Sequence, residues 1–249
     1  MNNTDSIEIG VMENDFQPKV AKIRSRIIEI CAVFGAGFLI LIVGLTFTGE
    51  HVVAKQAVVW LANIAMISGV VVALRHRGEG VKHVGIQAIE ASPRSWVRLF
   101  VASVLTFLLA VAGFVLGSII MANITGIPES ADMSSYNFLS GNLPVLLLVL
   151  AGVLVASSFG EEFLYRGFLI TWIAEILGGE KRAWITAAVI SSVAFGLAHY
   201  EWGLMGIVQT TFMGAALAFA WFKSKRNLWV VILAHAYMDM ILMIQMYLA

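Results

Sequence analysis

Two adjacent glutamates and one arginine lie inside a strongly apolar stretch of this chain. Glu161 and Glu162 are followed by Arg166, within a sequence that is 59% hydrophobic. A charged side chain at membrane depth costs about 2.5 kcal/mol or more on insertion scales, so such residues are functional candidates by default. Adjacent carboxylates in different surroundings can also take different roles in proton transfer. The pattern predicts acid–base chemistry on a buried water molecule.

Three further polar side chains interrupt apolar runs nearer the C-terminus. His199 ends the run SSVAFGLAHY, and His235 and Asp239 lie in VVILAHAYMDMILMI. Residues four apart share one face of a helix, so His235 and Asp239 are expected to face the same way, as are Glu162 and Arg166. The helical period of 3.6 turns Glu161 about 100° away from Glu162. Three helices could therefore contribute to one site.

These positions suggest how the chemistry is divided. Arg166 would hold Glu162 ionised, which leaves Glu161 as the general base that takes a proton from water and delivers hydroxide to a carbonyl. His199 could share the water or pass a proton to the leaving amine. His235, oriented by Asp239, could donate to the developing oxyanion. Water attacking an amide is the reaction that this set suits.

A metal centre would use the same residues. Glu161, His199 and His235 together make a His₂Glu set with one open water position, which is the pattern of catalytic zinc sites. The local HExxH spacing of zinc peptidases is absent from the sequence. Zinc and metal-free chemistry are therefore both open at this point.

The composition indicates a membrane protein. The mean hydropathy is +0.87 over 249 residues, and only 13% of the residues are charged. A soluble domain of this size could not cover so much apolar side chain with so little polar surface. The zero formal net charge argues against a nucleic-acid partner. The lipid bilayer is the expected surrounding, and the single cysteine, Cys31, excludes an internal disulfide.

We expect an all-α polytopic membrane protein, a bundle of about seven transmembrane helices. About 20 helical residues cross the hydrocarbon layer. The fourth apolar stretch is too long for one upright crossing, so it either tilts or breaks near Gly160. The expected spans are 27–48, 55–74, 96–122, 143–176, 184–200, 203–222 and 228–248.

Basic residues alternate between the expected loops. Clusters of Lys and Arg lie at 19–26, 75–98, 181–182 and 223–226, whereas Lys55 is the only basic residue in the intervening loops. The positive-inside rule therefore predicts a cytoplasmic N-terminus and an external C-terminus. His235 follows its basic cluster by fewer residues than His199 follows its own, so the helices must be offset along the membrane normal for these side chains to meet.

Three short motifs carry a family resemblance. Residues 161–167, EEFLYRG, resemble the EExxxR motif of the CAAX protease and bacteriocin-processing (CPBP) family, which includes the Ras-converting CAAX-prenyl endopeptidases. Residues 195–199, FGLAH, resemble its FxxxH motif, and residues 235–239, HAYMD, its HxxxN/D motif. All three occur in order within about residues 143–248.

The resemblance implies an all-helical intramembrane peptidase. By that likeness Glu161 is the base that activates water, His199 is its partner, and His235 with Asp239 stabilises the transition state. The family is often described as metal-dependent, so zinc is a possible cofactor. Asp239 departs from the Asn of the prenyl-protein endopeptidases, and an ionised carboxylate cannot donate a hydrogen bond. The oxyanion role would then rest more heavily on His235.

The sequence thus predicts a peptidase of the CAAX type, acting on a membrane-associated or lipidated protein or peptide, in a prokaryotic plasma membrane. Alternatives are a catalytically idle family member that serves as an immunity or scaffold protein, and a proton-coupled transporter. One membrane domain is expected, with a cytoplasmic tail (1–26), scaffold helices (27–142) and catalytic helices (143–249). Loop histidines such as His83, and glutamates near helix ends such as Glu29 and Glu175, carry no expected catalytic role.

Overall fold

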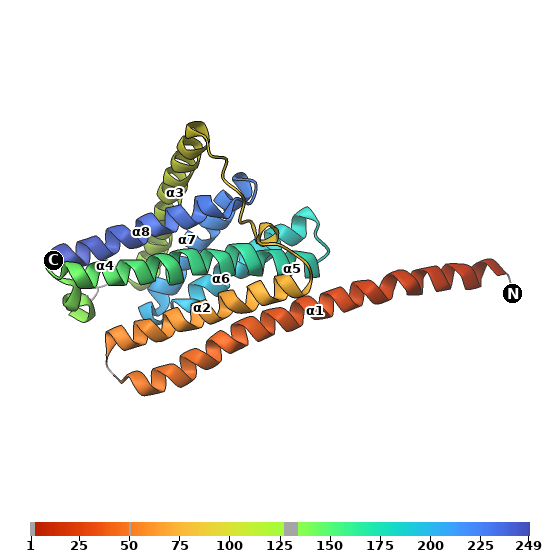
Figure 1. Cartoon of the computed structure of the whole chain (residues 1–249), viewed down its shortest axis with the longest axis horizontal. Helices are drawn as coiled ribbons and strands as arrows, with labels where there is room; N and C mark the ends of the chain where they lie inside the picture. Colours follow the sequence, from red (N-terminus) through yellow and green to blue (C-terminus); the bar gives the residue numbers. More distant parts are fainter. Residues whose placement is uncertain (1–2, 50, 127–133) are drawn as a thin grey trace.

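The computed structural model describes residues 3–49, 51–126 and 134–249, and these residues form helices joined by short connections, with no strand among them. Figure 1 shows the long helices side by side, with the start of α1 extending away from the bundle and the C-terminus at the opposite end. The α-helices are α1 (Asn3–Thr48), α2 (Val52–His76), α3 (Pro93–Thr125), α4 (Leu143–Gly152), α5 (Ile170–Ile176), α6 (Lys181–Ala198), α7 (Gly203–Lys223) and α8 (Leu228–Leu248).

Short helical turns connect or extend these helices. Between α4 and α5 the chain stays helical, but it widens into two π-helical segments, in which backbone bonds join residues five apart. The short segments are the 3₁₀ turns η1 (Val81–Val84), η2 (Ser134–Leu139) and η5 (Tyr200–Trp202), and the π-helical η3 (Val153–Phe159) and η4 (Glu162–Leu169).

The all-α bundle predicted from the sequence is confirmed, with one difference in the count of spans. Six helices in the described residues are long and apolar enough to cross a membrane. The expected span 184–200 corresponds to α6, which is not among them. With 18 residues α6 is about 27 Å long, and the basic pair Lys181 and Arg182 at its start makes it less apolar than the others.

Polar side chains start the helices where the sequence changes from loop to apolar run. The hydroxyl of Ser92 accepts from the backbone N–H of Ser95, and Pro93 occupies the first turn of α3. Asn227 caps α8 in the same way by accepting from the N–H of Trp229 at 3.1 Å. Such caps satisfy backbone donors that have no partner within the helix.

The stretch that was expected either to tilt or to break is one continuous helix. Leu143–Ile176 forms a single helical span of 34 residues, about 51 Å at 1.5 Å per residue, against about 30 Å of hydrocarbon. Gly160 has helical backbone angles of φ −62° and ψ −46°, so the helix does not break there. We call Leu143–Ile176 the long helix.

Side chains from neighbouring helices bond to carbonyls in both π-helical segments. Asn63 of α2 donates to the carbonyl oxygen of Ala156 at 2.9 Å in η3. Ser191 of α6 donates to the carbonyl oxygen of Tyr165 at 2.8 Å in η4. A π-helical turn disturbs the regular backbone ladder, and a buried carbonyl without a partner would be costly. Asn63 and Ser191 thus stabilise the wider turns on either side of Glu161.

The segment between α2 and α3 packs against the end of the long helix. The carbonyl oxygen of Val84 would lie only 2.7 Å from a Cβ built on Gly167, so this approach requires glycine. The next residue, Gly85, accepts from the N–H of Leu228 at 2.9 Å, which ties the same segment to the start of α8.

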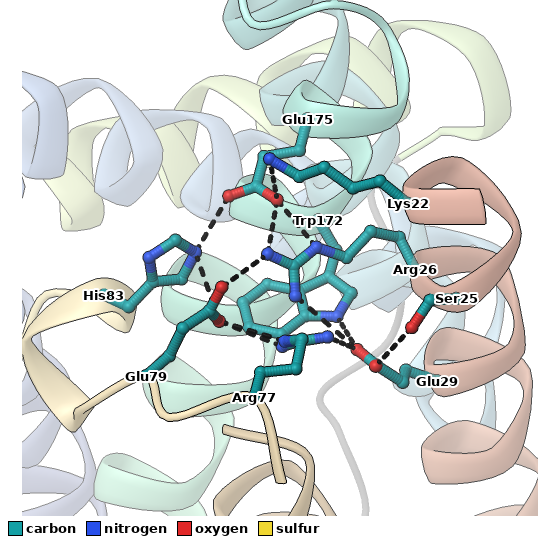
Figure 2. Close-up of polar contacts among 9 residues, drawn as sticks. All are labelled: Lys22, Ser25, Arg26, Glu29, Arg77, Glu79, His83, Trp172 and Glu175. Atoms are coloured by element: carbon teal, nitrogen blue, oxygen red, sulfur yellow. Dashed lines mark hydrogen bonds and ion pairs between the residues drawn. The ribbon is translucent and has the colours of Figure 1, made fainter. Parts of the chain in front are cut away.

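A cluster of charged side chains joins α1 and α2 to this end of the long helix (Figure 2). Arg26 is 2% exposed and bonds to Glu175 at 2.6 Å and to Glu79 at 3.0 Å. The indole of Trp172 donates to Glu29 at 2.6 Å. The members are Lys22, Ser25, Arg26, Glu29, Arg77, Glu79, His83, Trp172 and Glu175; we call them the anchor cluster.

Trp172 lies at the centre of the anchor cluster. The guanidinium carbons of Arg26 and Arg77 lie 4.3 Å and 4.7 Å from the indole centroid, within the range of cation–π attraction. His83 reaches Glu175 at 2.8 Å between Nε2 and Oε1. The carboxylates of Glu29, Glu79 and Glu175 balance the cations, so the helix end is fixed by paired charges. Basic segments at 22–26 and 75–82 thus gather at one end of the bundle, as the alternation predicted.

We expect Arg26→Gln to destabilise the protein by about 1–3 kcal/mol, because half-buried carboxylates lose a hydrogen-bonded cation. Thermal unfolding in detergent measures the effect. Arg24→Gln is the matched control, since Arg24 is exposed two residues away and surface changes stay within about 0.5 kcal/mol. Equal losses in both variants would contradict a stabilising role for the anchor cluster.

Candidate active site

One oxygen of Glu162 lies at the centre of the motif residues. Glu162 is fully buried, and its Oε1 accepts from Arg166 Nη1 at 2.6 Å and lies 2.8 Å from His235 Nδ1. A buried carboxylate is tolerated only with such partners. The i to i+4 pair expected from the sequence is present, and the structure adds His235 from α8 as a second partner.

Arg166 extends this contact to two more helices. Its Nη2 donates to the carbonyl oxygen of Gly214 in α7 at 3.3 Å, and its guanidinium carbon lies 4.3 Å from the ring centroid of Phe195 in α6. A Cβ on Gly214 would lie 3.2 Å from Arg166 Nη2, so glycine gives the guanidinium room. Arg166 is therefore enclosed by side chains and backbone of α6 and α7, as well as by Glu162.

Glu161 faces the other nitrogen of the same imidazole. Its Oε2 lies 4.0 Å from His235 Nε2, and 16% of its side chain is exposed, whereas Glu162 is fully enclosed. The two neighbouring carboxylates thus contact opposite sides of the His235 ring. The more accessible one, Glu161, lies beyond direct hydrogen-bonding distance of the ring.

Asp239 approaches the same nitrogen one turn further along α8. Its Oδ2 lies 3.8 Å from His235 Nε2 and accepts from the hydroxyl of Ser158 at 2.6 Å. The expected shared face of His235 and Asp239 is therefore present. Nε2 of His235 thus lies within 4.0 Å of oxygens from two carboxylates, those of Glu161 and Asp239.

His199 is held apart from these residues. Its Nδ1 lies 2.8 Å from the carbonyl oxygen of Phe195, and its ring packs 4.9 Å from that of Trp202. α6 ends at Ala198, so His199 lies at the helix terminus, where it bonds the carbonyl one turn before it. The Phe195 ring lies 4.8 Å from His199 and 6.1 Å from His235 between centroids. Among the residues that the structure describes, no hydrogen bond or ion pair joins His199 to Glu161 or Glu162.

The predicted metal ligands are Glu161, His199 and His235. Within the residues that the structure describes, no group of three or more His, Cys, Asp or Glu side chains could hold a metal ion. The predicted set of Glu161, His199 and His235 is not such a group among these residues. The contact of His199 Nδ1 with the Phe195 carbonyl leaves the Nε2 of that ring free. In this arrangement the residues do not fit a zinc centre, so the steps proposed below use no metal.

Sequence reasoning overlooked several residues that contact the site. Ser158, Asn63 and Gly214 belong to none of the three motifs. A weak signal existed for Ser158, since it precedes Glu161 by three residues and so shares nearly the same helix face. Asn63 is a polar residue within an apolar span, which by itself indicates a buried partner.

A polytopic helical bundle that encloses two glutamates, a histidine and an aspartate has the composition of an intramembrane hydrolase. Residues 142–241 match the family model described as type II CAAX prenyl endopeptidase Rce1-like, and this match supports membership of the CAAX protease family. Searches of curated proteins and of solved structures found no match. The match covers the long helix, α6, α7 and most of α8, so the family expected from the three motifs is confirmed, and with it a membrane-embedded protein of protease type.

We expect Arg166→Met to destabilise the fold by about 3–5 kcal/mol, because it leaves Glu162 charged and buried without its cation. Adding Glu162→Gln to this variant removes the unpaired charge and should recover much of the loss. Thermal unfolding of the two single variants and the double variant measures the coupling. Strictly additive losses would contradict a paired buried charge.

Proposed function

We propose that the protein is an intramembrane endopeptidase that hydrolyses a peptide bond of a membrane-associated or lipidated protein through water activated by Glu161. The 4.0 Å gap between Glu161 Oε2 and His235 Nε2 carries this proposal. For a water molecule at hydrogen-bonding distance from both atoms, about 2.8 Å, the angle between the two contacts at the water oxygen would be roughly 90°. Such a water could give a proton to the carboxylate while its oxygen stays free to attack.

The reaction runs in two steps at this position. The Glu161 carboxylate takes one proton from water, the water oxygen forms a bond to the peptide carbonyl carbon, and the carbonyl oxygen becomes an oxyanion. The carbon–nitrogen bond then breaks, and the proton on Glu161 passes to the leaving amine. Atoms and charge balance, since the water is divided between the two products.

His235 is suited to stabilise the oxyanion. With both ring nitrogens protonated it donates from Nδ1 to Glu162 and from Nε2 into the space beside Glu161. Donors that are already oriented toward developing charge usually supply the largest share of catalysis. Arg166 neutralises Glu162, so Glu162 holds the ring in place without adding an unpaired charge behind it.

Two expected roles change with this geometry. Asp239 Oδ2 lies 3.8 Å from His235 Nε2, beyond hydrogen-bonding distance, so it borders the ring as a nearby negative charge and leaves donation from Nε2 to His235. No hydrogen bond or ion pair joins His199 to Glu161 or His235 among the described residues, and Glu161 alone can return the proton to the leaving amine. We therefore place His199 outside the proton path in this conformation.

The substrate class follows from the family and the bundle. The matched model describes prenyl endopeptidases, and most large apolar side chains on the outside of the bundle are positioned to face lipid. A peptide attached to a lipid would be confined to the bilayer that the long helix is expected to cross. We propose a lipidated C-terminal peptide of the CAAX type as substrate.

We expect Glu161→Gln to lower kcat by about 10²–10⁴-fold, the usual contribution of a general base, because an amide cannot take a proton from water. The assay uses purified protein in liposomes and a quenched fluorescent peptide that ends in a farnesylated Cys-aliphatic-aliphatic-X sequence. Glu180→Gln is the matched control, since Glu180 is exposed before α6. Wild-type rates in the Glu161 variant would exclude the proposed mechanism, and a wild type without peptidase activity would favour the idle-scaffold alternative.

Metal analysis tests the metal-free pathway separately. Because no suitable group of three ligands forms among the described residues, we expect His235→Ala to leave the metal content of the purified protein unchanged. Plasma emission spectrometry on wild type and variant measures bound zinc per chain. Stoichiometric zinc in the wild type that disappears in the variant would mean that His199 moves to complete a His₂Glu centre.

A further inference from the structure

Ser158 contacts the candidate active site from within the long helix. It lies in η3, three residues before Glu161, and it is fully buried. Its hydroxyl donates to Asp239 Oδ2 at 2.6 Å, and it lies 3.5 Å from the carbonyl oxygen of Val153. One hydroxyl has a single proton, so the shorter contact with the carboxylate takes it.

The acceptor of this bond is the oxygen that faces the reacting space. Oδ2 of Asp239 lies 3.8 Å from His235 Nε2, and the same nitrogen lies 4.0 Å from Glu161 Oε2. Asp239 is 21% exposed, so without a fixed donor its carboxylate could rotate toward water. Ser158 holds it in the rotamer that borders His235.

We propose that Ser158 is a positioning residue that holds the Asp239 carboxylate against His235 during peptide hydrolysis. The proposal rests on the proposed function, because it assigns Ser158 a role in the same reaction. It also accounts for a carboxylate at position 239. A carboxylate accepts but cannot donate, and a serine hydroxyl supplies the matching donor from the helix that also carries Glu161.

The alternative is that the bond only joins two helices. Hydroxyl groups often hydrogen-bond between transmembrane helices, and their contribution to stability is modest. The contact between η3 and α8 would serve that purpose equally well. Kinetic constants separate the two roles, since a contact that only joins helices changes stability without a specific loss of kcat.

The test compares Ser158→Ala, Ser158→Thr, Asp239→Ala and the double variant Ser158→Ala/Asp239→Ala in the farnesylated-peptide assay. We expect Ser158→Ala to lower kcat about tenfold, which corresponds to about 1.4 kcal/mol of transition-state stabilisation, with KM unchanged. Ser158→Thr keeps the hydroxyl and should restore most of the rate. The double variant should be no slower than Asp239→Ala, because Ser158 acts through Asp239.

Ser157→Ala is the matched control, the same substitution one residue earlier in η3, and it should keep the wild-type kcat. Equal losses in Ser158→Ala and Ser158→Thr, or losses that add in the double variant, would overturn the positioning role. So would a loss of kcat in Ser157→Ala as large as that in Ser158→Ala, since any change in η3 would then have the same effect.

A second measurement needs no substrate. The melting temperatures of the wild type, Ser158→Ala, Asp239→Ala and the double variant should show coupling, so that the double variant melts close to the less stable single variant. Additive shifts would overturn the proposal whatever the peptidase result. Failure of the proposed function looks different: Glu161→Gln then cleaves as fast as wild type while the melting temperatures still show coupling, and the catalytic role of Ser158 is rejected together with that function.

Discussion

The contact that organises the candidate site is a single carboxylate oxygen. Oε1 of Glu162 lies 2.6 Å from Arg166 and 2.8 Å from His235, in a position without solvent. A carboxylate cannot stay charged there unless its partners stay in place. Through Arg166 the constraint reaches α6 and α7, and through His235 it reaches α8. The requirement to satisfy one buried charge thus sets how four helical segments meet.

The long helix is held on both sides of this contact. Toward its C-terminal end the guanidinium groups of Arg26 and Arg77 pack against Trp172, and toward its middle Asn63 bonds to a carbonyl of η3. Both constraints come from α1 and α2, which lie outside the matched region 142–241. The N-terminal helices therefore do more than surround the motif-bearing helices, because they fix the position and the local winding of the helix that carries Glu161 and Glu162.

Much of this was predictable from the sequence. The lengths of the apolar runs predict the helices. The four-residue spacing predicts the pairs Glu162 with Arg166 and His235 with Asp239. Three features were not predictable. His83 was assigned to a loop without a role, yet it contacts Glu175 at 2.8 Å, because a loop folded back onto a helix end has no periodic signature. His199, which was expected beside Glu161, has its Nδ1 on the carbonyl oxygen of Phe195, because the last turn of a helix leaves carbonyls that a nearby ring can bond. The π-helical winding was not predicted either, because arguments from helical periodicity assume 3.6 residues per turn.

By itself the sequence determined the class of the protein, its helices and the chemical types available at the site. Hydropathy and short-range spacing are local properties, so they can be determined from the amino-acid sequence without knowledge of the tertiary structure. Only the tertiary structure decided that His235 bonds to Glu162 with one nitrogen and faces Glu161 with the other, and that Ser158 reaches Asp239. These contacts join residues more than 70 positions apart, and their distances depend on helix depth and rotation, which only the packing of the whole bundle fixes.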